Sequence, residues 1–245
     1  MKDKYERGRL NIFGDSSRDI KPRWIYTCNC GWLDISHSDD TTKRPYVGAG
    51  NLWSQILHET GKKSSYDDGY KIIYAQDANI KKLINIGGAG TYFVKCGLSR
   101  EQKESVALGI FLEVSYRFER MQGLAFWSDS SFSQEDLISN IFGFYSTVRP
   151  QPNYWDECKP VSQEAAFEIY KDIVDTHGSM GAVKNKDHLK PILYPCSECD
   201  ECKKQFPSIL QKITPARNEI LRSSVAPKEI RLYRDWKLYD EMDSR

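Results

Sequence analysis

The longest apolar pattern of the chain predicts a helix over residues 99–122. Apolar side chains surround nearly its whole circumference in the stretch Val106–Val114, and a helix of that kind is normally buried at the centre of a fold. Ser99 and Gln102 have the spacing of a capping box at its start, and Gly123 is a typical residue at a helix end. The chain is therefore expected to be organised around one long, central helix.

Two shorter helices are predicted downstream. Ser133 and Asp136 repeat the start signal of a polar residue followed by an acid, and the apolar pattern ends before Pro150. This gives a helix over 133–147, which we expect to pack beside the long one. Residues 161–177 have an amphipathic pattern with apolar positions at helical spacing, which predicts a surface helix.

Strands are predicted where β-branched and aromatic residues cluster, in 24–28, 31–35, 70–75 and 91–96. A helix is predicted over 51–59. Between the last two strands, residues 77–85 (DANIKKLIN) predict a short helix and residues 87–90 (GGAG) a turn.

These elements predict a helix-rich α+β fold. We expect a single domain over 1–245, in which residues 1–22 are loosely held because they are mostly polar. Residues 23–150 are expected to form the core with the functional site. Residues 151–245 are expected to form a C-terminal extension that cysteines fasten to that core.

Composition and charge restrict the classes of partner that the protein is expected to bind. The net charge of +1 gives no reason to expect nucleic acid. No run of about 18 apolar residues is present, so no membrane span is expected. The N-terminus, MKDKYERGRLNIFGDSS, has no apolar signal core. The expectation is a protein made in the bacterial cytoplasm without a recognisable leader, and acting in the periplasm after export.

Seven cysteines are present, and the odd number excludes complete intramolecular pairing. Cys196, Cys199 and Cys202 are spaced as candidate ligands of a structural zinc, the one cofactor that the pattern suggests, with His188 or Cys158 as a fourth ligand. The alternative is disulfide bonding of this cluster to Cys158 or to the N-terminal cysteines. In both cases the cluster is interpreted as structural.

Two carboxylates on the long helix are candidates for catalysis. Glu113 has Arg117 one turn away, and an ion pair between them is the simpler interpretation. Glu119 lies near the helix end, where an apolar environment should raise its pKa and suit it to general acid chemistry. Pairing with an arginine is the alternative. The candidates for a second carboxylate, as glycoside cleavage requires, are Asp129, Glu135 and Asp136.

His37 is a second centre of interest because Asp34 precedes it by three residues. A carboxylate can fix a histidine tautomer for base chemistry or for metal binding. Cys30 and His37 could alternatively form the pair of a cysteine hydrolase. The candidates for contacting substrate are Trp127, Asp129, Ser133 and Asn140.

Three blocks of the chain resemble the bacterial family known as domain of unknown function 4056, over roughly residues 20–150. The first is a Gly-apolar-apolar-Asp-x-x-His block at 31–37, and the second is a helix block that contains Glu113 and Glu119. The third block is matched by Ser130, Phe132, Ser133, Glu135, Asp136, Ser139, Asn140 and Gly143.

Where the family pattern has a histidine, this chain has Phe118. That difference weakens any mechanism that needs two histidines, including a metal site made of His37, the missing histidine and Glu119. The family has no established activity, so the resemblance implies a shared site more than a reaction.

The leading hypothesis is a hydrolase of bacterial cell-wall peptidoglycan, more glycosidase than amidase, acting as an interbacterial toxin effector. Glu119 would be the general acid, with Glu113, Asp34, His37 and Asp136 as further catalytic candidates. Its partners would be the polymer and an immunity or delivery protein. The alternatives are a metal-dependent or Cys–His peptidase or amidase centred on His37, and a non-enzymatic binding module.

Overall fold

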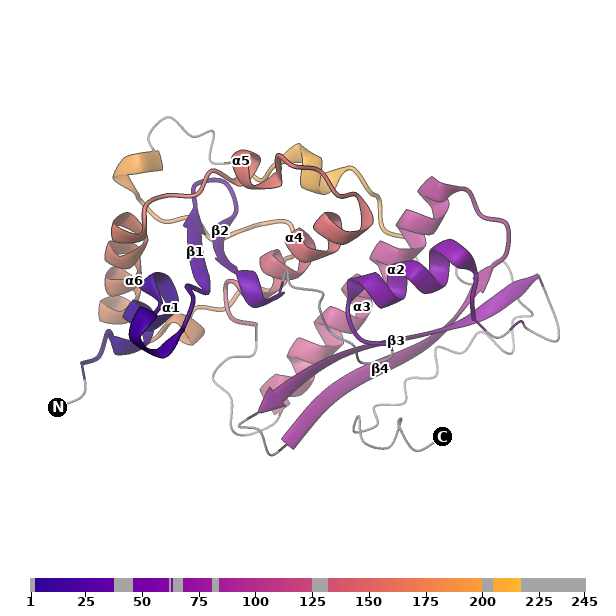
Figure 1. Ribbon diagram of the computed structural model, residues 1–245, viewed down its shortest axis with the longest axis horizontal. Coiled ribbons are helices and arrows are strands. Elements are labelled where there is room, and N and C mark those ends of the chain that lie inside the picture. Colours follow the sequence, from indigo (N-terminus) through magenta and orange to yellow (C-terminus); the bar gives the residue numbers. More distant parts are fainter. Residues whose placement is uncertain are drawn as a thin grey trace. The chain divides into compact units, whose positions relative to one another are not determined.

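The chain divides by its contacts into two compact units in the computed structural model (Figure 1). Unit 1 consists of Met1–Asp39 and Ala125–Lys212, and unit 2 of Asp40–Leu124 and Ile213–Arg245. The structure describes residues 3–37, 46–61, 63, 68–80, 84–124, 132–199 and 205–216, without the side chains of 37, 77–80, 84–89 and 120–124. Each unit is described by itself.

Unit 1 is built on an antiparallel hairpin of β1 (Trp24–Thr27) and β2 (Gly31–Asp34). Helix α6 packs against α1 and β1, whereas α4 packs against β2 (Figure 1). One face of the hairpin is buried among apolar side chains of α6, because Trp24, Tyr26 and Trp32 alternate with residues of the other face. The helices of this unit are α1 (Glu6–Phe13), α4 (Asp136–Val148), α5 (Tyr154–Cys158) and α6 (Gln163–His177).

The N-terminal segment differs from the expectation of a loosely held tail. Residues Glu6–Phe13 form α1, and Ile12 is buried in the core. Gly8 allows α1 to approach α6 closely, because a Cβ atom at Gly8 would lie 2.1 Å from the ring of Tyr170. The sequence did not indicate this helix because the contact depends on a glycine and a distant aromatic ring.

Unit 2 contains α2 (Ala49–His58), the antiparallel strands β3 (Gly69–Ile80) and β4 (Ile84–Lys95), and α3 (Arg100–Leu124). Helix α3 packs against both strands and against α2, so it is the central element of this unit. The capping box is present: Ser99 N donates to Gln102 Oε1 at 2.9 Å, and Gln102 N donates to Ser99 Oγ at 3.3 Å.

The hairpin of β3 and β4 corrects the prediction for residues 77–90. Neither a helix over 77–85 nor a turn at 87–90 is present, because β3 continues to Ile80 and β4 starts at Ile84. Gly90 is a strand residue opposite Tyr74. A Cβ atom at Gly90 would lie 2.5 Å from the ring of Tyr92, so the glycine makes room for that ring.

The helix-rich α+β class is confirmed, with short antiparallel strands in two small sheets. The predicted helices over 51–59, 99–122, 133–147 and 161–177 correspond to α2, α3, α4 and α6. Helices α3 and α4 belong to different units, so their packing side by side stays a prediction. The core over 23–150 and the extension over 151–245 stay predictions too. Among the described helices, none combines the length and the apolar character that a bilayer span requires.

Candidate functional site

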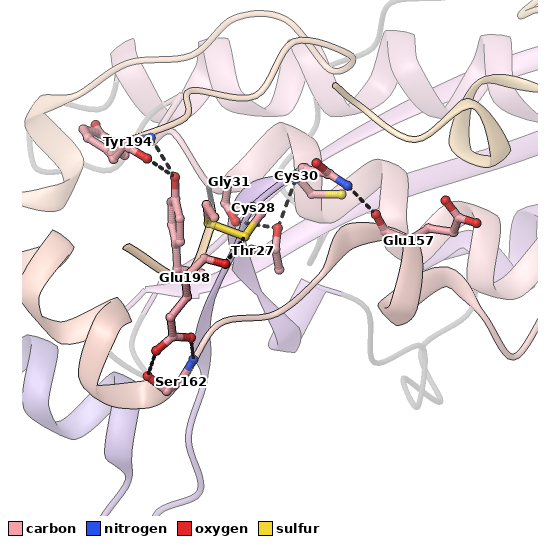
Figure 2. The surroundings of a disulfide bond; sticks show 11 residues. Thr27, Cys28, Cys30, Gly31, Glu157, Ser162, Tyr194 and Glu198 are labelled. Atoms are coloured by element: carbon pink, nitrogen blue, oxygen red, sulfur yellow. Dashed lines mark hydrogen bonds between the residues drawn. A yellow bond between two sulfur atoms is a disulfide. The ribbon is translucent and has the colours of Figure 1, made fainter. Parts of the chain in front are cut away.

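Four cysteines of unit 1 fasten two distant segments to the turn of the β1–β2 hairpin, and Figure 2 shows the surroundings of one of the two bonds. Cys28 is bonded to Cys199, and Cys30 is bonded to Cys158. All four are buried, with exposed fractions of 4% or less. Of the predicted cluster, Cys199 is thus bonded to an N-terminal cysteine, which is the disulfide alternative.

These two disulfides exclude two of the roles that the sequence suggested for the cysteines. Cys30 has no free thiol and is fully buried, so it cannot be the nucleophile of a Cys–His hydrolase. Cys199 is not available as a zinc ligand, because its sulfur is bonded to Cys28. Cys196 is free, while Cys202 lies outside the described residues. Within the part of the chain that the structure describes, no three His, Cys, Asp or Glu side chains gather as a metal-binding group.

His188, the proposed fourth ligand, gives a prediction about pH. Its Nε2 atom is buried without a hydrogen-bond partner among the described residues, and burial lowers the pKa of His188 to about 4 although the charge of Asp187 opposes this. The unfolded chain takes up this proton below its ordinary pKa of 6.5. The neutral side chain therefore contributes stability above pH 6.5, which is lost as the pH falls towards 4.

We expect His188→Gln to flatten the decline of the free energy of unfolding between pH 6.5 and pH 4. Urea unfolding at several pH values measures this slope, with the exposed His177→Gln as the control. Equal slopes for wild type and His188→Gln would contradict the prediction.

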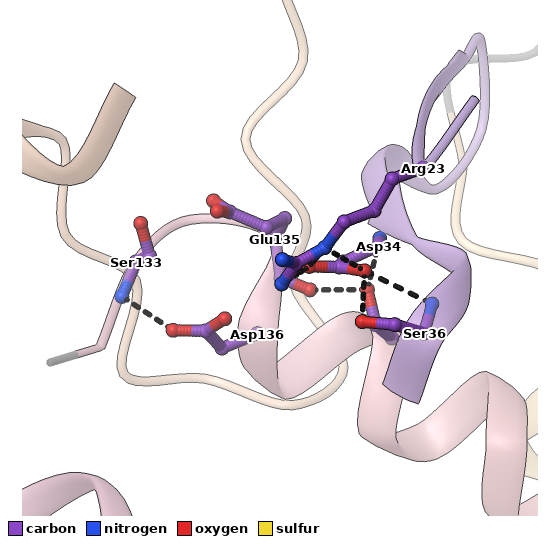
Figure 3. Close-up of polar contacts among 7 residues, drawn as sticks. Arg23, Asp34, Ser36, Ser133, Glu135 and Asp136 are labelled. Carbon is purple, nitrogen blue, oxygen red and sulfur yellow. Dashed lines mark hydrogen bonds and ion pairs between the residues drawn. The ribbon is translucent and has the colours of Figure 1, made fainter. Parts of the chain in front are cut away.

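A polar cluster lies where β2 ends and α4 begins, around a pair of Asp34 and Arg23 (Figure 3). The carboxylate of Asp34 is 1% exposed, and it accepts from Arg23 Nε at 2.7 Å and also from Arg23 Nη2. Asp34 further accepts from the backbone N and the hydroxyl of Ser36, at 3.0 and 2.6 Å. The guanidinium side of the pair is half exposed, so the cluster reaches the surface through Arg23.

The N-terminal part of α4 is joined to this pair by Ser139. Its hydroxyl accepts from the backbone N of Asp34 at 2.7 Å and donates to the backbone O of Glu135 at 2.5 Å. One turn earlier, Ser133 N donates to Asp136 Oδ2 at 3.1 Å. The first and third sequence blocks therefore meet in unit 1, and hydrogen bonds within the fold account for several of their polar residues.

Three buried carboxyl side chains lie near one cation in this cluster. Asp34, Glu135 and Asp136 are 1%, 5% and 8% exposed. The pKa of Arg23 is raised, chiefly by its hydrogen bonds to Asp34, and the nearby charges of Glu135 and Asp136 act in the same direction. The cluster thus holds a firmly protonated guanidinium in an acidic environment, which suits it to orient a polar ligand or to fix α4 against β2.

Removal of this cation should be costly. We expect Arg23→Met to lower the free energy of unfolding by about 2–4 kcal/mol, because the buried carboxylate of Asp34 loses its cation. Urea unfolding measures the change. In Arg23→Met combined with Asp34→Asn, part of the stability should return.

The matched control is Arg18→Met, which removes an ion pair with Asp15 on the surface of the same unit. That change should cost much less, because an ion pair in contact with water contributes little. If Arg23→Met cost no more than Arg18→Met, the cluster would not depend on the cation.

The two glutamates of the long helix both lie on α3 in unit 2. Glu113 forms an ion pair with Arg117, as the simpler interpretation predicted. Glu119 is 1% exposed, and the side chains of Ser115 and Phe118 on the same helix are also buried. Glu119 is thus a buried carboxyl group on the central helix of unit 2.

Unit 1 contains most of the other predicted site residues. Asp34, Ser133 and Asp136 lie in the polar cluster, and Asn140 is buried on α4. His37 belongs to the 3₁₀ turn Ile35–His37 after β2, and its side chain is not described. Trp127 and Asp129 lie outside the described residues.

Arg23, the cation of the cluster, was not among the residues that the sequence suggested, and neither was Ser36. The hairpin register offered a signal for Arg23. Since Trp24 is paired with Asp34, the residue before Trp24 has to lie beside the end of β2. Ile35 N indeed donates to Arg23 O at 2.9 Å.

Comparison with known proteins gives no relative: no family model, no curated protein and no solved structure matches the chain. The resemblance to domain of unknown function 4056 therefore stays a prediction, and the functional argument depends on the residues themselves.

Proposed function

We propose that this protein is a hydrolase of bacterial cell-wall peptidoglycan that cleaves glycosidic bonds with Glu119 as the general acid. The observation that supports this role is the burial of Glu119, whose side chain is 1% exposed on the central helix of unit 2. A general acid must hold its proton until the leaving group needs it. Exclusion of water favours the protonated form of a carboxyl group.

The disulfides support the proposal that the protein acts outside the reducing cytoplasm. Bonds such as Cys28–Cys199 and Cys30–Cys158 form and persist in oxidising environments, including the bacterial periplasm. Peptidoglycan lies in that compartment, and a toxin effector delivered to a competing cell would meet its substrate there. An immunity protein would then be needed where the producing cell meets its own toxin.

The test is the digestion of purified peptidoglycan by the oxidised, full-length protein, with mass spectrometry of the soluble products. Glycan fragments with new reducing ends are the expected result. Products of peptide or amide cleavage would contradict the glycosidase and favour an amidase centred on His37. No release beyond that of a buffer control would contradict a hydrolase of this polymer.

A non-enzymatic binding module is the second candidate, and the hydrogen bonds of the polar cluster favour it. The hydroxyl of Ser139 joins Asp34 to α4, and Asp136 holds the backbone of Ser133. Residues with such roles fix a fold without chemistry. Sedimentation with insoluble peptidoglycan tests this candidate: retention on the polymer without any cleavage supports a binding module, and absence of retention contradicts it.

A further inference from the structure

Three cysteines of unit 1 lie in one apolar cluster, and the proposed hydrolysis uses none of them. Cys28 and Cys199 are joined to each other within this cluster. Cys196 is a free, half-buried thiol that packs against the same cluster. One thiol and one disulfide are therefore enclosed together.

The backbone brings Cys196 close to Cys199. Cys199 N donates to Cys196 O at 3.0 Å, which closes a turn over the sequence Cys-Ser-Glu-Cys. Residues at the two ends of such a turn have Cα atoms within about 7 Å of each other. Disulfides usually span Cα distances of about 4.4–6.8 Å. The Cα separation of such a turn is therefore compatible with a bond between Cys196 and Cys199.

We propose that Cys196, Cys199 and Cys28 form a thiol–disulfide exchange site, in which Cys199 changes its partner from Cys28 to Cys196. Cys196 first loses its proton to solvent, and its thiolate attacks Cys199 Sγ. A bond between Cys196 and Cys199 forms as the Cys199–Cys28 bond breaks. Cys28 leaves as a thiolate and takes a proton from solvent. One disulfide and one thiol are present before and after, so the step needs no external oxidant.

Because the sulfurs of Cys28 and Cys199 are buried, exchange with a thiol of the same chain is favoured over exchange with a thiol in solution. Cys199 is 1% exposed and Cys28 is 4% exposed, so a reductant in solution has little access to their bond. Cys196 needs no such access because it packs against the apolar cluster that contains both of them. Thiol–disulfide exchange depends on access as well as on the thiolate form of the attacking cysteine.

The exchange changes how the segment before Cys199 is held to the hairpin. With Cys28 bonded, that segment is covalently tied to the turn after β1 (Figure 2). After exchange, only weaker contacts hold it: Tyr26 Oη donates to Tyr194 O at 3.2 Å and accepts from Tyr194 N at 2.6 Å. Burial raises the pKa of Tyr26 to about 12, so its hydroxyl keeps its proton in these contacts.

A second, polar contact also remains after exchange. Glu198 accepts from Ser162 N at 2.8 Å and from Ser162 Oγ at 2.6 Å, which joins the Cys-Ser-Glu-Cys turn to the start of α6. The Cys30–Cys158 bond is unaffected. The exchange therefore makes one of the two disulfide links to the hairpin reversible. The other disulfide stays intact.

The experiment maps disulfides in the oxidised, full-length protein carrying Cys202→Ala, so that no further thiol of the 196–202 segment competes. The protein is held at pH 6, 7.5 and 9 without reductant. Free thiols are then trapped with a maleimide under denaturing, mildly acidic conditions, and peptides are mapped by mass spectrometry. We expect a peptide with a Cys196–Cys199 bond together with maleimide-labelled Cys28, both increasing with pH because the attacking species is a thiolate.

Two variants test the role of Cys196. In Cys196→Ser and in Cys196→Ala, labelling of Cys28 should be lost, whereas Cys96→Ala, which removes the free thiol of unit 2, should leave it unchanged. Cys28 that stays unlabelled at pH 9 in the protein carrying only Cys202→Ala would overturn the proposal. Equal labelling of Cys28 with and without Cys196 would overturn it too.

Discussion

Glu119→Gln should reduce the release of glycan fragments from peptidoglycan by about 10²–10⁴-fold, the usual contribution of a general acid. The amide has nearly the shape of the carboxyl group but no proton to transfer. The loss corresponds to about 3–5 kcal/mol of transition-state stabilisation. Initial rates of product release, measured by mass spectrometry at matched protein concentration, give the ratio.

The matched control for this substitution is Glu113→Gln on the same helix. Glu113 is bound by Arg117, so its loss should change the stability of unit 2 but leave catalysis within a few-fold of wild type. The opposite ranking would move the general acid from Glu119 to Glu113. Urea unfolding of both variants shows whether a loss of activity reflects chemistry or folding. A fully active Glu119→Gln would contradict the assignment.

Replacement of Cys30 and Cys158 together by Ser should lower the free energy of unfolding by about 4 kcal/mol. The bond joins residues that are 128 positions apart. It therefore restricts the unfolded chain strongly, even though the Cys28–Cys199 bond already restricts part of the same region. Both sulfurs are fully buried, so the two hydroxyl groups of the variant add a cost of burial. Urea unfolding without reductant measures the change.

Cys96→Ser is the control for that measurement, because Cys96 is a free, half-buried cysteine of unit 2. It should cost less than about 1 kcal/mol. A double variant as stable as Cys96→Ser would show that the Cys30–Cys158 bond is absent in solution. Addition of reductant to wild type should lower the stability further than the double variant does, because both bonds are then lost.

The helices could be predicted because their signals are local. Ser99 with Gln102 marks the start of α3, and Ser162 accepts a hydrogen bond from Ala165 N at the start of α6. Such capping needs only residues three positions apart. The predicted strands were likewise found where aromatic and β-branched residues cluster, although β3 and β4 extend much further than those clusters.

The outer part of the β3–β4 hairpin could not be predicted for the opposite reason. Residues 77–90 have little local preference for a strand, and glycines are usually unfavourable there. In the structure, Gly88 is paired with Gln76 and Gly90 with Tyr74, so each strand is specified by its partner. A pattern within one segment does not contain that information.

The polar cluster was predicted in part. Asp34, Ser133 and Asp136 were candidates because of their spacing, yet the structure gives them hydrogen bonds that hold β2 and α4 together. Arg23 was missed because its role follows from the strand register. The pairing of Cys28 and Cys30 was left open, since spacing along the chain does not determine which of seven cysteines meet.

The position of both disulfides at one hairpin turn has a consequence for biosynthesis. Cys28 and Cys30 are made early, whereas their partners follow 171 and 128 residues later. At typical rates of synthesis this is a delay of roughly 5–35 s. Until Cys158 has been made, the two cysteines can bond only to each other or to Cys96, and until Cys199 has been made Cys28 can also bond wrongly to Cys158 or Cys196. In an oxidising compartment the correct pairing is therefore completed only after Cys199 has been made, and a protein disulfide isomerase should speed maturation by undoing premature bonds.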